Sequence, residues 1–189
     1  MRRIRLAIES TKRLCRDRRG ATLVEFAFVV PVLTFLTLAS IELGRYVLLN
    51  QKLQNAATSL ADLAARGRTL SVAQLDSMFA AVPSITQPYD FTDQGIAIVT
   101  SINSTVADDP EVAWQRTGGG TLVKSSQIGS PGGNATIPGD LPTRAGDTII
   151  AAEVYFDFVP LFNILLTEKT LYRSAFVRPR LGTLTTLDP

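Results

Sequence analysis

An apolar run near the N-terminus limits the chain more than any other feature of its sequence. From Ala21 to Ile41, the only charged residue is Glu25. As an α-helix, a run of this length spans about 31 Å, at about 1.5 Å per residue, which matches the hydrocarbon core of a bilayer, roughly 30 Å thick. The sequence therefore predicts a single membrane-spanning helix with an acidic residue near one end.

That acidic residue needs an explanation, because a carboxylate at mid-bilayer costs about 2.5–3.5 kcal/mol on insertion scales. One interpretation places Glu25 in the headgroup zone, where the cost is small. The other gives it a cationic partner in an assembly of helices. Cleavage after Gly20 would create an α-amino group at Ala21, about one helical turn from Glu25. In a stack of staggered helices, the amine of one copy could then meet the carboxylate of the next.

The segment before the apolar run is strongly basic. Residues 1–20 contain eight Arg or Lys and two acidic residues, a net charge of +6, whereas the whole chain carries +2, so residues 21–189 carry −4. A positive flank directly before a membrane span sets topology by remaining in the cytoplasm. We therefore expect a cytoplasmic leader, a periplasmic C-terminal part and no nucleic-acid partner.

The available residue types limit the chemistry of the outer part. The chain has no histidine, which excludes Ser-His-Asp triads, Cys-His pairs and histidine metal sites. Its single cysteine, Cys15, lies in the basic segment, so no disulfide can form within one copy. The sequence also lacks a Gly-rich phosphate-binding loop. We therefore expect that the protein is not an enzyme and has neither a cofactor nor a metal site.

Helical and then strand patterns follow the span. An apolar stripe over residues 47–64, without proline or glycine, predicts one helix from about Thr22 to Arg66. Its first half should lie in lipid, and its second half is amphipathic. Ser71 and Gln74 form a capping-box pattern for a short helix that Pro83 should end. Residues 84–93 have the composition of a loop.

Strand patterns occur at residues 96–102, 112–116, 148–158 and 171–177, and residues 160–166 form a short helical or buried connector. The strand at 148–158 alternates clearly. Its apolar face should pack on the core, whereas Glu153 and Asp157 lie on the more polar face, which we expect to meet solvent. The apolar face consists of Ile150, Ala152, Val154, Phe156 and Phe158.

These patterns together predict an α+β fold in which three or four antiparallel strands pack on the C-terminal half of the long helix. The chain then divides into a basic leader at residues 1–20, a transmembrane and stem helix at 21–66, and a periplasmic α+β domain at 67–189.

Several of these residues also carry a family resemblance. Gly20 followed by Ala21-Thr22-Leu23-Val24-Glu25 is similar to a type IV prepilin cleavage site, with glycine before the cut and glutamate at the fifth position after it. Residues 20–31, 42–45 and 64–66 together resemble TadE-like proteins. These are minor pilin-like components, or pseudopilins, of the tight-adherence (Flp) pilus assembly system. The match is strongest over about the first third of the chain.

The resemblance implies a pilin-like shape and a structural or assembly role at the bacterial inner membrane. It implies cleavage between Gly20 and Ala21 by a prepilin peptidase, and registration of neighbouring helices by Glu25. It also implies contact with other pilins or pseudopilins, with the inner-membrane assembly platform and with the lipid bilayer. These residues have no catalytic role in this account, because the chain is the substrate of the peptidase.

Two other interpretations remain open. The chain could be an uncleaved, single-span periplasmic binding protein or enzyme, in which Asp147, Glu153 and Asp157 would act as acid/base groups. The apolar run could instead be a secretory signal peptide cut before Ser40, although it exceeds the usual hydrophobic region of about 7–15 residues. The N-terminal residue of the membrane protein separates these interpretations.

Overall fold

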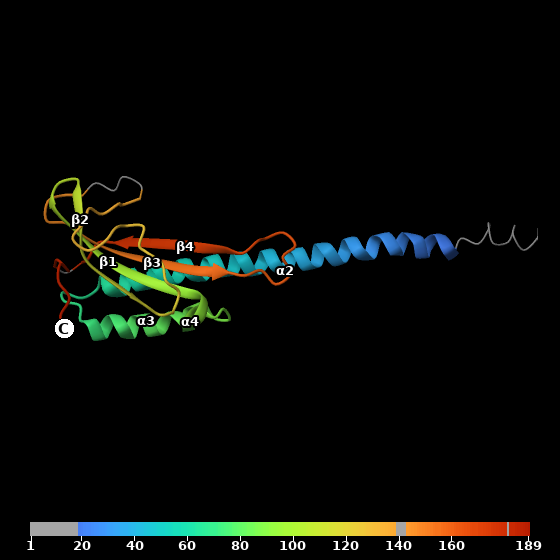
Figure 1. Cartoon of the computed structure of the whole chain (residues 1–189), viewed down its shortest axis with the longest axis horizontal. Coiled ribbons are helices and arrows are strands. Elements are labelled where there is room, and N and C mark those ends of the chain that lie inside the picture. The colour runs from blue at the N-terminus through green and yellow to red at the C-terminus, as the bar shows by residue number, and fades with distance from the viewer. Residues whose placement is uncertain (1–18, 139–142, 181) are drawn as a thin grey trace, which may run out of the picture.

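The computed structural model of the chain describes residues 19–138, 143–180 and 182–189. The leader up to residue 18, with Cys15, lies outside the described residues. The elements are, in chain order, α2 (Arg19–Ala64), α3 (Val72–Thr86), α4 (Phe91–Gln94), β1 (Gly95–Val106), β2 (Asp109–Gly118), β3 (Thr148–Phe158) and β4 (Lys169–Val177). Figure 1 shows that α2 extends far beyond a small domain built from its C-terminal half and the other elements. The fold is therefore α+β.

The first half of α2 projects from the domain as an apolar rod. Every residue from Gly20 to Thr37 is exposed, although this part of the helix has a mean hydropathy of 2.1 over its most apolar window. The helix continues through Pro31. Three hydroxyls, those of Thr34, Thr37 and Ser40, donate to carbonyls four residues earlier, so they need no partner outside the helix. This half is long and apolar enough to cross a membrane.

The second half of α2 forms one side of the domain core. The predicted helix at residues 22–66 is confirmed, with ends that differ by two or three residues. Its apolar stripe packs against β3, β4 and α3, because residues three and four apart share one helix face. The buried stripe consists of Leu49, Leu53, Ala56, Ala57, Leu60, Ala61 and Ala64.

The four strands form one antiparallel sheet in the order β2-β1-β3-β4. All four predicted strands are confirmed, three of them with longer ends. The predicted apolar face of β3, from Ile150 to Phe158 at every second residue, belongs to the core that faces α2. The sheet therefore lies on the stem helix as the alternation in β3 indicates.

The other face of β3 does not meet solvent as predicted. The long β2–β3 loop covers it, and Ile128 and Ala135 of this loop pack with Ile149 and Ala151 of β3. Glu153 is consequently fully buried, which contradicts its predicted exposure, whereas Asp157 remains half-buried near the strand end. The alternation of polar residues cannot reveal a cover that comes from a distant, Gly-rich loop.

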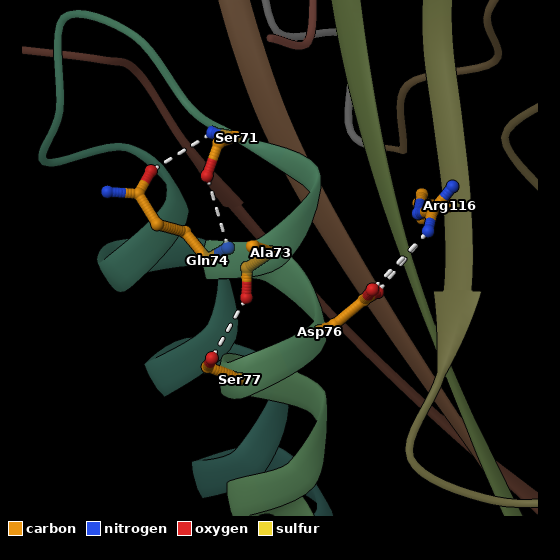
Figure 2. A network of polar contacts seen from close by, with 6 residues as sticks. All are labelled: Ser71, Ala73, Gln74, Asp76, Ser77 and Arg116. Carbon is orange, nitrogen blue, oxygen red and sulfur yellow. Dashed lines mark hydrogen bonds and ion pairs between the residues drawn. The ribbon is translucent and has the colours of Figure 1, made fainter. Parts of the chain in front are cut away.

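Helix α3 begins at the predicted capping box. The Ser71 hydroxyl accepts from the Gln74 N–H at 3.2 Å, and the Gln74 side chain accepts from the Ser71 N–H at 3.0 Å, as Figure 2 shows. Further along the helix, an ion pair of 3.4 Å joins Asp76 to Arg116 of β2. The capping box thus stabilises the first turn of α3, and the ion pair links the helix to strand β2 of the sheet.

Two local predictions are wrong. Pro83 does not end α3, which continues to Thr86. Its ring removes one backbone donor, and the Thr86 hydroxyl donates to the Val82 and Pro83 carbonyls at the helix end. The predicted loop at 84–93 therefore includes this helix end and most of α4.

The connector at residues 160–166 contains no helix, and it is largely exposed although it is apolar.

Candidate functional site

Gly20, Ala21 and Glu25 all lie in the exposed first two turns of α2. Helical geometry places Ala21 and Glu25 on one face, four residues apart. A Cβ atom added at Gly20 would meet nothing within 4 Å, and glycine costs about 1 kcal/mol in a helix relative to alanine. The fold therefore gives no reason for a glycine at this position.

Glu25 is an isolated charge within the apolar rod. Its side chain is exposed, and within the part of the chain that the structure describes it has no hydrogen-bond or ion-pair partner. A carboxylate in apolar surroundings is stable only when a cation or hydrogen-bond donors compensate it. The structure thus leaves Glu25 available to a group from outside the described residues.

A second acidic residue of α2, Glu42, occupies a site that the sequence did not reveal. Glu42 is 1% exposed, and its carboxylate accepts hydrogen bonds from four successive backbone N–H groups of the β3–β4 loop. The donors are Phe162 and Asn163 to Oε1, at 3.3 and 3.0 Å, and Ile164 and Leu165 to Oε2, at 3.3 and 3.2 Å.

The conformation of the loop explains this convergence. Asn163 has a φ of 51°, in the left-handed region that asparagine tolerates better than most residues. A left-handed residue among right-handed ones turns successive N–H groups towards one point and forms an anion-binding concavity. The acidic residue at the end of the apolar run is visible in the sequence, but its partners lie about 120 residues away along the chain.

Aromatic and cationic side chains lie beside this loop. Arg45 lies over the ring of Tyr89, 5.7 Å from its centroid, and Lys169 lies over the ring of Tyr46, 4.3 Å from its centroid. Tyrosine, lysine and arginine side chains are typical of the membrane–water boundary. Here Arg45 and Tyr46 follow the exposed first half of α2 along the chain, and Tyr89 and Lys169 lie against them.

A third carboxylate, Glu153 of β3, is buried beneath the β2–β3 loop. It accepts from the Ser126 hydroxyl, from the Gln127 N–H at 2.9 Å, and from the hydroxyls of Tyr155 and Tyr172, each at 3.1 Å. Burial raises the pKa of both tyrosines, that of Tyr172 to about 12, and the negative charge of Glu153 adds to the rise. The cluster holds the loop on the sheet.

The three carboxylates considered as acid/base groups do not converge. Asp147 pairs with Arg178 at 3.6 Å, and Asp157 pairs with Lys124 at 3.6 Å. At about 3.3 Å per strand residue, Glu153 lies about 13 Å from Asp157 and about 20 Å from Asp147. Among the described residues, no group of three or more Cys, Asp or Glu side chains could hold a metal ion.

A family model described as TadE-like protein matches residues 20–62. The matched segment comprises nearly all of α2, including Gly20, Ala21 and Glu25, and it confirms the resemblance to TadE-like proteins there. No curated protein and no solved structure matches the chain.

Proposed function

We propose that the chain is a minor pilin-like component, or pseudopilin, of a tight-adherence (Flp) pilus assembly or secretion system, with a structural role. One observation carries the proposal: the TadE-like match coincides with a helix whose first half is apolar, exposed and projected away from the domain. A helix of this kind can anchor the protein in a membrane and can also pack against the helices of other subunits.

In this proposal, a prepilin peptidase cleaves the bond between Gly20 and Ala21. Glycine suits the peptidase, since it has no side chain, and the fold itself does not require glycine there. The new α-amino group at Ala21 then pairs with Glu25 of a neighbouring subunit in lipid, where each charge would be costly alone. The partners are the peptidase, other pilins or pseudopilins, and the assembly platform of the inner membrane.

The basic leader remains in the cytoplasm until cleavage, and the sheet domain lies in the periplasm. The chain acts as a subunit and not as an enzyme in this account.

Cleavage is tested first by the substitution Gly20→Leu. We expect the mature wild-type protein in membranes to begin at Ala21, and the variant to keep its leader of about 2.4 kDa, the mass of twenty residues. Gly44→Leu is the matched control, because Gly44 lies in the same helix and a Cβ there also meets nothing within 4 Å. An N-terminus at Met1 in the wild type would instead support an uncleaved anchor, and one at Ser40 a secretory signal.

The role of Glu25 is tested by Glu25→Ala. We expect normal membrane insertion, because the substitution removes a charge from an apolar helix, but weaker pilus assembly. Glu111→Ala, at an exposed position of β2, is the control for a lost carboxylate far from the membrane. Wild-type piliation in the Glu25→Ala strain would count against registration of helices by this residue.

A further inference from the structure

The β3–β4 loop, residues 159–168, exposes large apolar side chains. Leu161, Phe162 and Leu165 are 59%, 44% and 56% exposed. Figure 1 shows this loop (orange) against α2, at the end of the sheet from which the long helix projects. A cluster of exposed apolar residues on a loop marks a contact with a membrane or a partner.

The apolar surface of α2 continues on either side of this loop. Ile41, Leu43, Val47 and Leu48 are all exposed, and helical geometry places them roughly 100–140° around the axis from Glu42, which faces the loop. At the level of Glu42, the molecule therefore presents apolar side chains from the loop on one side and from the helix on the others. We refer to residues 161–165 together with these four helix residues as the apolar collar.

The backbone of the loop is also suited to apolar surroundings. An irregular segment in lipid is costly because its N–H and C=O groups lack water as a partner. Here the carboxylate of Glu42 accepts from four successive N–H groups of residues 162–165. The donors of the most apolar part of the loop are thus satisfied within the protein.

We propose that the apolar collar is inserted into the lipid bilayer, at the boundary between headgroups and acyl chains, as a second membrane contact beside the spanning helix. Three observations favour lipid as the occupant. The collar is continuous with the exposed apolar half of α2, and the N–H groups of residues 162–165 are satisfied internally. The Lys169–Tyr46 and Arg45–Tyr89 pairs, which are typical of the membrane–water boundary, lie at the same level of α2 as the collar.

This contact fixes the height and tilt of the sheet domain relative to the membrane. It requires that the exposed half of α2 lie in lipid, and it does not depend on the role in a pilus.

The collar is tested with nitroxide spin labels on the full chain, reconstituted in vesicles of phosphatidylethanolamine and phosphatidylglycerol. Single cysteines are introduced in a Cys15→Ser background as Phe162→Cys or Leu165→Cys. Leu33→Cys reports the span. Two exposed valines serve as matched apolar controls. Val106→Cys lies at the last residue of β1, at the opposite end of the sheet, and Val123→Cys replaces a side chain that is 91% exposed. Fluorescence of the single tryptophan verifies that each labelled variant is folded.

We expect labels at 162 and 165 to collide severalfold more often with lipid-soluble oxygen than with an aqueous nickel chelate. The label at 33, in the span, should show the same preference. The labels at 106 and 123 should show the reverse preference. Labels at 162 and 165 that behave like those at 106 and 123 would overturn the proposal. Labels shielded from both reagents would also overturn it, because a second protein copy would then cover the loop. A label at 33 outside lipid would refute the membrane span itself.

The contribution of Glu42 is tested with the label at 165. Glu42→Ala removes the acceptor of four loop N–H groups, so we expect a more mobile label with a sharper spectrum. Glu168→Ala, an exposed acidic residue of the same loop without contact to these donors, is the control. An unchanged spectrum in Glu42→Ala would show that the carboxylate does not hold the loop.

Discussion

The buried carboxylate of Glu153 gives the sharpest stability test of the outer domain. We consider the substitution Glu153→Gln, which keeps the size of the side chain but replaces one acceptor oxygen with an NH2 donor. The wild-type carboxylate accepts from Ser126, Gln127, Tyr155 and Tyr172. An amide in this position cannot accept hydrogen bonds from all four donors, because its oxygen is an acceptor and its nitrogen is only a donor.

The expected loss of stability follows from the donors that remain without a partner. The Tyr155 hydroxyl also reaches the Ser125 carbonyl at 3.1 Å, so it keeps an acceptor. Gln127, Tyr155 and Tyr172 all donate to Oε1, so an amide oxygen in that place still accepts from them. Only the Ser126 hydroxyl then loses its acceptor, at about 1–3 kcal/mol for a buried group. Removal of the buried charge offsets part of this loss, because the neutral amide does not incur the desolvation penalty of a buried carboxylate. We expect a net destabilisation of about 1–2 kcal/mol.

Urea unfolding of the full chain in detergent micelles measures this difference. Trp114, the only tryptophan, is buried and donates to the Leu184 carbonyl at 2.9 Å, so its fluorescence reports the integrity of the domain. Asp157→Asn is the matched control, since Asp157 lies on the same face of β3 but is half-exposed, and an exposed pair contributes about 0–1 kcal/mol. A loss in Glu153→Gln no larger than in this control would refute the reasoning.

Three further predictions concern the same domain. Ser71→Ala removes the acceptor at the start of α3 and should cost about 1 kcal/mol in the same titration; an unchanged midpoint would contradict a stabilising cap. The pKa of Tyr172 is raised to about 12, above the usual value of about 10 for an unfolded chain, so its contribution to stability is complete below about pH 10 and is lost as the pH rises towards 12. Melting temperatures across this range should fall less steeply in Tyr172→Phe, and equal slopes would argue against the linkage. Gly120→Ala would place a Cβ 2.2 Å from the Gly95 carbonyl oxygen and should destabilise the domain by about 2–3 kcal/mol, whereas wild-type stability would mean that the loop shifts freely.

The sequence predicted those elements whose signals lie within a few residues of one another. The apolar stripe of α2 repeats every three or four residues, the capping box of α3 spans Ser71 to Gln74, and the core face of β3 alternates from Ile150 to Phe158. Each pattern predicts a local backbone geometry, and the structure contains these elements with only small differences at their ends.

The sequence also led to Glu25, because it is the only charge in the apolar run, and to Gly20, because of the resemblance to a prepilin cleavage site. Their roles in cleavage and registration stay predictions. The structure adds that the fold itself has no need of glycine at residue 20 and offers Glu25 no partner among the described residues.

The partners of Glu42 and Glu153 could be known only from the tertiary structure. In the sequence, one is an acidic residue after an apolar run and the other lies on the polar face of a strand. Each instead meets a loop that is remote in the chain, residues 162–165 for Glu42 and residues 126–127 for Glu153. Local periodicity determines which face of a helix or strand is apolar, but the donors that surround a buried charge depend on how distant loops close over that face.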